Sequence, residues 1–270
     1  MLGANKELTE EHYLNVCDGT MFVKIFKPKN KQYVEPIILL HDSLGCVELW
    51  RDFPYVLSEK TGRNVIAYDR LGFGKSSVRH ERPSINFINE EAELYFPELV
   101  KHLSLNQCYL FGHSVGGAMA LVCAALYPNR VIGVITESAQ AFVEDRTKEG
   151  ILKAKKDFER HELFKKIEQY HGEKAKWVLD AWTEVWLSKE FAPWSLSDIL
   201  PHVFCNLLVI HGDLDEYGSN RFPDMISDQA AGRAEKIIIP GCGHVPHREN
   251  KNLIIELINT FLNHYDDLIQ

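Results

Sequence analysis

The chain has 270 residues, of which 45% are apolar and 25% are charged, and its net charge is -8. This composition is typical of a folded globular protein and argues against long disordered segments. The basic residues are scattered, whereas nucleic-acid binding needs clustered Lys and Arg. Met1 to Glu11 is polar, and the longest apolar run, Met119 to Tyr127, is too short to span a bilayer. We therefore expect a cytoplasmic protein with no nucleic-acid or membrane partner.

The first predicted element is an antiparallel hairpin. Tyr13 to Lys27 contains two runs of β-branched and aromatic residues that flank Asp18-Gly19, a pair suited to a type I′ turn. Six continuous apolar runs of strand length follow, a pattern typical of strands buried on both faces of a sheet. They are Pro36 to His41, Asn64 to Asp69, Gln107 to Phe111, Val131 to Thr136, Asn206 to His211 and Glu235 to Pro240.

Helical patterns separate most of these predicted strands. They lie at 47–60, 84–103, 114–127 and 220–230, and a last one covers 248–264. Strands that alternate with helices are joined by right-handed crossovers. The sequence therefore predicts an α/β protein with a doubly wound, mostly parallel sheet that follows the N-terminal hairpin.

One interval between strands is much longer than a single crossover helix needs. About seventy residues separate Thr136 from Asn206. We expect two or three helices there, with Gly172 and Pro193 as helix stops. The prediction is a core domain formed by residues 1–140 and 201–270, with a helical lid at 141–200 inserted into the same domain.

The predicted lid holds four of the five tryptophans, between Trp177 and Trp194. Several of them lie at helical spacing with other apolar residues, which indicates one apolar helix face. Packing of the lid against the sheet accounts for most of this face. A minority of these side chains could line an apolar substrate cleft.

The segment Gln107 to Tyr127 contains the predicted nucleophile. In it a strand runs into GHSVGG, residues 112–117, and then directly into a helix. A serine between a strand and a helix takes a strained backbone conformation, and glycines two residues to either side leave room for the sharp turn. The turn places the Ser114 hydroxyl at a helix N-terminus, where backbone dipoles favour a developing negative charge.

A serine nucleophile needs a general base, and the base needs an acid that fixes its tautomer. The last predicted strand opens into a glycine-rich loop that carries His244, the predicted base. The strand before it ends in GDLDE, where Asp215 is the preferred acid. Asp213 is then a turn-forming residue and Glu216 a solvated one. Glu137, just after an earlier strand, is an outside candidate for the acid.

These segments resemble, in chain order, the catalytic motifs of the α/β-hydrolase superfamily. GHSVGG looks like its nucleophile elbow, GDLD like its acid loop and GCGH like its histidine loop. Asp69 to Ser76 is similar to the D-x-x-G-x-G-x-S loop, and His41 to Gly45 occupies the place of the HGxxG oxyanion loop. The resemblance covers nearly the whole chain outside the lid. It implies the α/β-hydrolase fold with Ser114, Asp215 and His244 as the catalytic triad.

The oxyanion loop departs from the family pattern, because Asp42 stands where glycine is usual. By position, the resemblance makes the backbone N–H groups of Ser43 and Val115 the oxyanion-hole donors. Each such donor typically contributes roughly 3 kcal/mol of transition-state stabilisation.

Residues next to the predicted triad argue against several reaction classes known for this fold. Haloalkane dehalogenases and epoxide hydrolases of this fold have aspartate in place of Ser114. Carbon-carbon bond hydrolases usually carry Asn and Trp where this chain has His113 and Val245, and proline iminopeptidases carry GGPG in place of HDSLG. The resemblance therefore implies a serine hydrolase that cleaves a carboxylic ester or thioester of a small, partly apolar substrate through an acyl-enzyme intermediate.

Other functions stay open at this point, because one fold carries many chemistries. A carbon-carbon bond hydrolase of the same fold, a ligand receptor that hydrolyses slowly, and a pseudoenzyme are the alternatives. No cofactor or metal is expected, since His244-x-x-His247 alone does not make a metal site. A homodimer is compatible with the sequence, which does not determine the oligomeric state.

Overall fold

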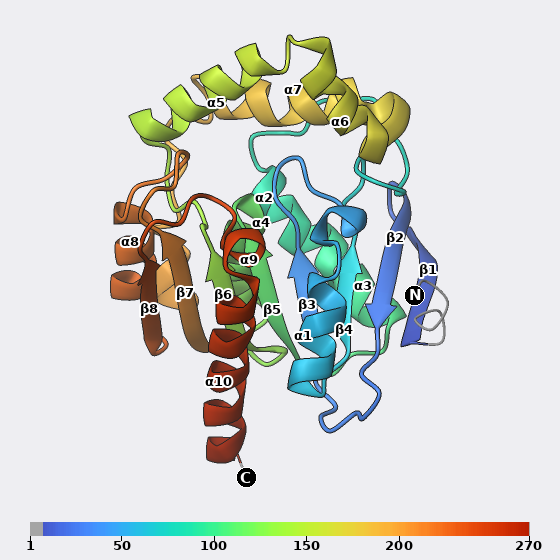
Figure 1. Ribbon diagram of the computed structural model, residues 1–270, viewed down its shortest axis with the longest axis vertical. Helices are drawn as coiled ribbons and strands as arrows, with labels where there is room; N and C mark the ends of the chain where they lie inside the picture. The colour runs from blue at the N-terminus through green and yellow to red at the C-terminus, as the bar shows by residue number, and fades with distance from the viewer. Residues whose placement is uncertain (1–7, 270) are drawn as a thin grey trace.

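The computed structural model describes residues 8–269, so most of the polar stretch 1–11 lies outside the described residues. Its centre is an eight-stranded sheet in the order β1-β2-β4-β3-β5-β6-β7-β8 (Figure 1). The pairs β1/β2 and β2/β4 are antiparallel, and all the other pairs are parallel. The strands are β1 (Thr9–Val16), β2 (Gly19–Phe26), β3 (Ile37–Leu40), β4 (Val65–Tyr68), β5 (Cys108–His113), β6 (Val131–Glu137), β7 (Asn206–Gly212) and β8 (Ala234–Ile239).

Helices connect these strands and flank the sheet. The α-helices are α1 (Phe53–Thr61), α2 (Phe87–Glu90), α3 (Phe96–His102), α4 (Val115–Leu126), α5 (Asp145–Asp157), α6 (His161–His171), α7 (Ala175–Trp186), α8 (Arg221–Gln229), α9 (Pro246–Glu249) and α10 (Lys251–Ile269). Short 3-10 turns are η2 (Val47–Trp50), η4 (Gly172–Lys174) and η5 (Leu200–His202), and η3 (Glu91–Tyr95) is a π-helical turn. Within residues 8–269, no helix has both the length and the hydropathy needed to cross a bilayer.

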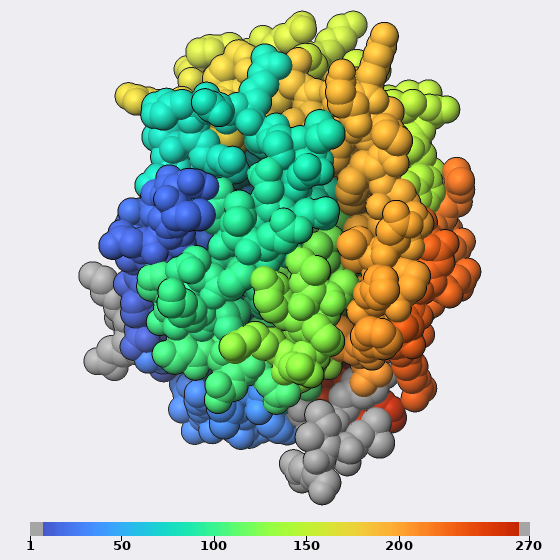
Figure 2. Space-filling model, turned by 180° about the vertical axis from the view of Figure 1, so that it is seen from behind, coloured from blue at the N-terminus to red at the C-terminus, as the bar shows by residue number. Residues whose placement is uncertain are grey.

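Two apolar cores lie on the two faces of the sheet. Helices α3, α4 and α8 pack on one face, and α1 and α10 pack on the other (Figure 1). Seen from behind, α2 to α4 form much of the surface, and the segment that follows α7 runs down beside them (Figure 2). Every residue of β3, β4 and β5 is buried, which explains their continuous apolar sequences. The predicted doubly wound α/β fold with an N-terminal hairpin is confirmed.

The turn of the hairpin differs from the prediction. Val16 pairs with Gly19, so Cys17 and Asp18 are the two loop residues. A type I′ turn needs positive φ at both loop residues, and neither Cys17 nor Asp18 has it. Gly19 is instead the first residue of β2, with a φ of 150°. The Asp-Gly pair therefore marked the hairpin but not the turn type.

The helix predicted over 47–60 is two elements. The 3-10 turn η2 ends at Trp50, and Arg51 has the unusual backbone angles φ 54° and ψ -124°. Helix α1 then begins at Phe53 with Pro54 in its first turn, a position that proline favours because its missing N–H has no helical partner there. The break turns the chain between the oxyanion loop and the sheet face that α1 covers.

Helices α5, α6 and α7 all lie between β6 and β7, and they cover the end of the sheet where the parallel strands terminate (Figure 1). We call residues 141–200 the lid segment. Helix α6 ends at His171 and is followed by Gly172 with a φ of 57°, as predicted for that stop. Helix α7 ends at Trp186, so the predicted stop at Pro193 is wrong. Pro193 lies in the turns that follow α7.

His171 and Lys174 join the lid segment to two core loops. His171 Nε2 donates to the Leu44 carbonyl at 3.0 Å, and its Nδ1 accepts the Gly74 N–H at 3.0 Å. Burial lowers the pKa of His171, so the ring is neutral and Nδ1 can accept this bond. Lys174 Nζ donates to the carbonyls of Phe73, Gly74 and Ser76. The lid segment is therefore held to both the 41–45 loop and the 69–76 loop.

The His171 contact can be tested by its effect on stability. His171→Ala leaves a buried carbonyl and amide without their partners, and we expect the free energy of unfolding to fall by about 2 kcal/mol in urea titrations. The control is His161→Ala at the exposed start of the same helix, which should change it by less than about 0.5 kcal/mol. Equal losses in the two variants would contradict the proposed role of His171.

Candidate active site

A tight turn between β5 and α4 presents the predicted nucleophile. Ser114 has φ 58° and ψ -127°, a strained conformation for a residue with a side chain. A Cβ atom on Gly116 would lie 2.2 Å from the Leu40 carbonyl oxygen, and one on Gly112 would lie 2.2 Å from the Gly116 carbonyl oxygen. Both glycines are therefore required by close packing. The turn directs Ser114 Oγ toward the loops at the carboxyl ends of β7 and β8.

The structure brings Ser114, His244 and Asp215 together. Ser114 Oγ lies 3.0 Å from His244 Nε2, and His244 Nδ1 lies 2.8 Å from both carboxylate oxygens of Asp215. Asp215 also accepts the backbone N–H of Tyr217 at 2.8 Å. This arrangement assigns the Nδ1 proton of His244 to the bond with Asp215. Nε2 is then left as the acceptor for the serine hydroxyl.

Asp213 and Glu216, the neighbouring carboxylates, lie elsewhere. Asp213 is exposed, and its Oδ1 accepts the backbone N–H of Gly241 at 2.7 Å, which ties the loop after β7 to the loop after β8. Glu216 is also exposed and lines the cavity in front of Ser114. Within the GDLDE loop, Asp215 is thus the carboxylate in contact with His244.

Asp215 and His244 each stabilise the charged form of the other, which shifts both pKa values. Burial alone would lower the pKa of His244, but the charge and hydrogen bond of Asp215 outweigh it and raise that pKa above its ordinary value. Burial would raise the pKa of Asp215, yet the interaction with His244 holds it below its usual range. Asp215 is therefore ionised at neutral pH.

Glu137, the outside candidate for the acid, belongs to a different buried pair. It accepts the backbone N–H of His247 and bonds the His247 ring nitrogen Nδ1, both at 2.5 Å. Burial opposes its ionisation, but His247 outweighs burial and lowers the pKa of Glu137. His113 Nε2 donates to the carbonyl of His244 at 2.9 Å, and burial lowers the pKa of His113 to about 4. Through these bonds to the His244 carbonyl and the His247 amide, His113 and Glu137 hold the loop that carries His244 in place.

Among the described residues, His113, Glu137 and His247 also form a group close enough to hold a metal ion, with ligand atoms within 4.8 Å of one another. The bonds just described already engage Nε2 of His113, Nδ1 of His247 and both oxygens of Glu137. Most of the possible metal-ligand atoms are thus already hydrogen-bonded within the protein. That the chain uses no metal stays a prediction.

Hydrogen bonds from His41 and Arg70 fix the backbone of the HDSLG loop, residues 41–45. The Asp42 carbonyl accepts bonds from His41 Nδ1 and Arg70 Nη2, each at 2.8 Å, and His41 Nε2 accepts the Arg70 N–H at 3.1 Å. Burial lowers the pKa of His41 well below its ordinary value, so the ring is neutral and can make both bonds. In a trans peptide the C=O and the next N–H point in opposite directions. Fixing the Asp42 carbonyl therefore turns the Ser43 N–H away from His41 and Arg70.

Both predicted oxyanion donors adjoin the serine. Ser43 lines the same pocket as Ser114 and His244. Val115 is the first residue of α4, where a backbone N–H has no partner within the helix. Within residues 8–269, no loop or cap hydrogen bond uses the amide of Ser43 or Val115. The two amides are available to a ligand.

Several residues at the site had no role in the sequence-based prediction. Gln140 Nε2 lies 3.1 Å from Ser114 Oγ, and the ring of Tyr217 packs against that of His244 with centroids 4.8 Å apart. Trp182 lines the pocket in front of Ser114, whereas Trp186 is buried against Phe191. The spacing of the tryptophans indicated a packed face, but no sequence signal pointed to Gln140.

The comparisons with known proteins agree with this geometry. Residues 35–174 match the family model described as alpha/beta hydrolase fold. A proline iminopeptidase of Lactobacillus helveticus is 23% identical over 270 residues, which is 86% of this chain and 91% of the relative. The 1-acylglycerol-3-phosphate O-acyltransferase ABHD5 of Rattus norvegicus is 33% identical over 135 residues, or 48% of this chain. That match spans only 37% of the acyltransferase.

The fold is similar to solved structures along nearly its whole length. The structure of proline iminopeptidase from Mycobacterium smegmatis superposes with a TM-score of 0.73 and 20% identity, and covers 97% of this chain and 100% of that one. The family match spans more than half of the 270 residues, and the sheet order, the turn at Ser114 and the inserted helices agree with it. The chain belongs to the α/β hydrolase family.

Proposed function

We propose that this hydrolase cleaves a carboxylic ester or thioester through an acyl-enzyme intermediate on Ser114. The observation that carries the proposal is the chain of contacts from Ser114 Oγ to His244 Nε2 and from His244 Nδ1 to Asp215. Such a chain supplies a nucleophile, a general base and the group that fixes the tautomer of the base. The strained turn at Ser114 supports the same role, since strain concentrates at functional sites.

In the proposed mechanism, His244 Nε2 takes the hydroxyl proton as Ser114 Oγ attacks the substrate carbonyl carbon. Asp215 stabilises the imidazolium that forms, and the backbone N–H groups of Ser43 and Val115 stabilise the oxyanion. His244 then gives its proton to the leaving alcohol or thiol, and the acyl group stays on Ser114. In the second half, His244 deprotonates a water that attacks the acyl carbon and releases the acid.

The surroundings of Ser114 suit a small, partly apolar substrate. The pocket there has a volume of about 210 Å³, and Leu44, Ile151 and Trp182 supply apolar walls. Iminopeptidases are among the relatives, but the HDSLG loop of this chain lacks the GGPG sequence of that class. Loop sequence and pocket together favour ester chemistry over peptide hydrolysis. We also propose that residues 141–200 act as a lid on the core formed by 1–140 and 201–270.

The nucleophile can be tested by substitution. Ser114→Ala should abolish both covalent labelling by a fluorophosphonate and turnover of p-nitrophenyl esters, because no other group can form the acyl-enzyme. Circular dichroism should show the fold intact, since the hydroxyl packs against no apolar core. Labelling that persists in this variant would overturn the assignment of Ser114.

If His244 is the general base, activity should depend on pH. His244 must be neutral to accept the serine proton, so kcat/KM for an aryl ester should rise with pH. Because Asp215 raises the pKa of His244, the midpoint should lie above about 6.5, the ordinary value for histidine. A pH profile between 5 and 9 checks this. A flat profile, or a midpoint below the ordinary value, would contradict it.

The acid can be identified with a matched pair of substitutions. Asp215→Asn should lower kcat by a factor on the order of 10⁴, because the amide no longer holds His244 in the productive tautomer. Asp213→Asn, two residues away, should cost far less, since the Asp213 carboxylate bonds the Gly241 amide. Steady-state kinetics of both variants measure the difference. If kcat fell strongly in Asp213→Asn and only slightly in Asp215→Asn, Asp213 would be the acid instead.

A further inference from the structure

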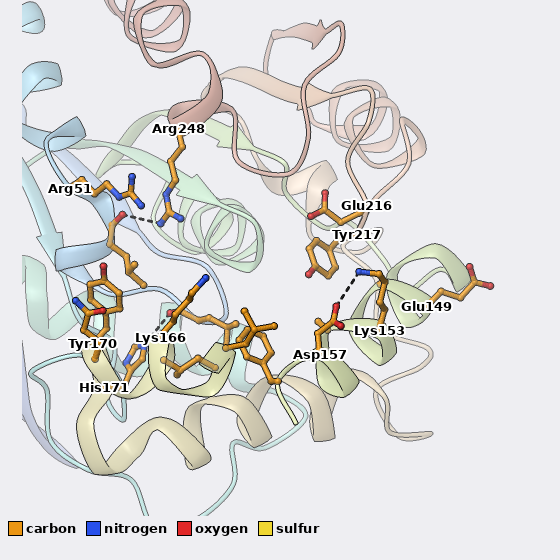
Figure 3. Close-up of a pocket in the computed structure, with 18 of the residues that line it drawn as sticks. Arg51, Glu149, Lys153, Asp157, Lys166, Tyr170, His171, Glu216, Tyr217 and Arg248 are labelled. Atoms are coloured by element: carbon orange, nitrogen blue, oxygen red, sulfur yellow. Dashed lines mark hydrogen bonds and ion pairs between the residues drawn. The ribbon is translucent and has the colours of Figure 1, made fainter. Parts of the chain in front are cut away.

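A large cavity adjoins the pocket at Ser114. It has a volume of about 950 Å³ and lies between helices α5 and α6 of the lid segment and the core loops (Figure 3). Leu44, Glu216 and Tyr217 line both this cavity and the smaller pocket at Ser114. A substrate with its scissile bond at Ser114 can therefore extend into the larger space. We call this space the outer chamber.

Three cationic side chains gather on one side of the outer chamber. Arg51 follows η2, Arg248 lies on α9 and Lys166 lies on α6, and all three line the cavity. Arg248 Nη2 donates to the Leu49 carbonyl at 2.9 Å, which holds its guanidinium beside the segment that carries Arg51. Figure 3 shows Arg51, Arg248 and Lys166 around the same part of the opening. Three segments far apart in the sequence thus supply one positively charged wall.

These cations have no acidic partner in the described part of the chain, where no carboxylate lies within 4.0 Å of Arg51, Lys166 or Arg248. The acids Glu149 and Asp157 come from α5, on the opposite side of the chamber (Figure 3). Asp157 is already engaged by Lys153 at 3.1 Å. The positive wall is therefore not neutralised from within the chamber, although this chain carries a net charge of -8.

The charges near Ser114 have the opposite sign. Asp42 and Glu216 line the small pocket, so an anionic group would be repelled there. Between the two charged regions the chamber offers apolar surface from Leu44, Leu49 and Ile167. The Arg51 side can accommodate an anion at the far end of a substrate whose ester group lies at Ser114, whereas on α5 the cation Lys153 is paired with Asp157. Arginine pairs are well suited to carboxylate and phosphate, whose oxygens match the guanidinium fork.

We infer that the outer chamber binds an anionic group of the substrate, a carboxylate or a phosphate, separated by an apolar stretch from the ester cleaved at Ser114. The inference rests on the proposed function, and it adds the substrate class. Arg51, Arg248 and Lys166 are the residues that recognise the anion. The strained backbone of Arg51, with a φ of 54°, directs its side chain to this wall at a conformational cost.

The kinetic test uses matched pairs of esters. Mono-p-nitrophenyl esters of glutaric, adipic and suberic acid are compared with the same esters whose far carboxyl is a methyl ester. We expect the wild type to favour the anionic member, increasingly with chain length, as the carboxylate reaches the Arg51 side. A second arm compares an acylglycerol phosphate with the uncharged acylglycerol, and shows whether phosphate or carboxylate is the preferred anion.

The double substitution Arg51→Gln and Arg248→Gln should lower the ratio of kcat/KM for anionic over neutral esters by about tenfold. Lys166→Gln should lower the ratio by less, and Lys165→Gln, on the same helix but outside the chamber, is the matched control that should leave it unchanged. The wild-type preference should also shrink as salt is added. An unchanged ratio in the double variant would overturn the inference while the hydrolase proposal stood.

A binding measurement separates the two proposals. Calorimetric titration of the Ser114→Ala protein with monomethyl suberate and with inorganic phosphate needs no turnover, and affinity for at least one anion should fall about tenfold in the Arg51→Gln, Arg248→Gln background. If no ester were hydrolysed yet this loss were seen, the proposed function would fail and the anion site would stand. If neither anion bound to the parent protein, the anion site itself would be rejected.

Discussion

The tight turn between β5 and α4 is the constraint on which the rest of the site depends. Ser114 keeps its strained backbone angles because α4 packs directly against β3, with Gly116 close to the Leu40 carbonyl. Leu40 ends β3, and the HDSLG loop follows it at once. The positions of Ser114 and of the start of the HDSLG loop are therefore set by one backbone contact. A side chain at Gly116 would force α4 away from β3 and disturb both.

Buried histidines around this turn divide into two kinds, according to their partners. Burial is the largest influence on His41, His113 and His171, and it lowers the pKa of each. These rings stay neutral, so they bind backbone groups and hold loops in place. At His244 burial is again the largest single influence, but the charge and hydrogen bond of Asp215, together with the charges of Glu216 and Asp42, outweigh it and raise the pKa. The same side chain thus serves as a structural hydrogen-bonding group or, at His244, where the ring contacts both Asp215 and Ser114, as a candidate base.

The lid segment contributes to the site in two ways. Its His171 and Lys174 hold the 41–45 and 69–76 loops, so that the geometry of the oxyanion loop depends partly on residues more than a hundred positions later. Its helices α5 and α6 also wall the outer chamber. The lid segment therefore links the support of the 41–45 and 69–76 loops to the shape of the outer chamber.

Local sequence determined the features that depend on short-range chemistry. Apolar runs identified the buried strands, and glycines around Ser114 identified the turn, because only glycine permits such close backbone contact. The loops that carry Asp215 and His244 could be located, since the carboxyl ends of parallel strands meet at one edge of the sheet. Asp215 was preferred within GDLDE because it lies farther out on the loop than Asp213, and its contact with His244 appears only in the folded chain.

Only the tertiary structure decided what depends on contacts between distant segments. The turn type of the hairpin, the break at Arg51 and the end of α7 at Trp186 all departed from local patterns. Gln140 reaches Ser114, and Glu137 pairs with His247 instead of His244, because neighbouring strands bring these side chains to the same sheet edge. The positive wall of the outer chamber combines residues from η2, α6 and α9. Each of its cations is ordinary in sequence, and only the packing of these segments concentrates their charge at one place.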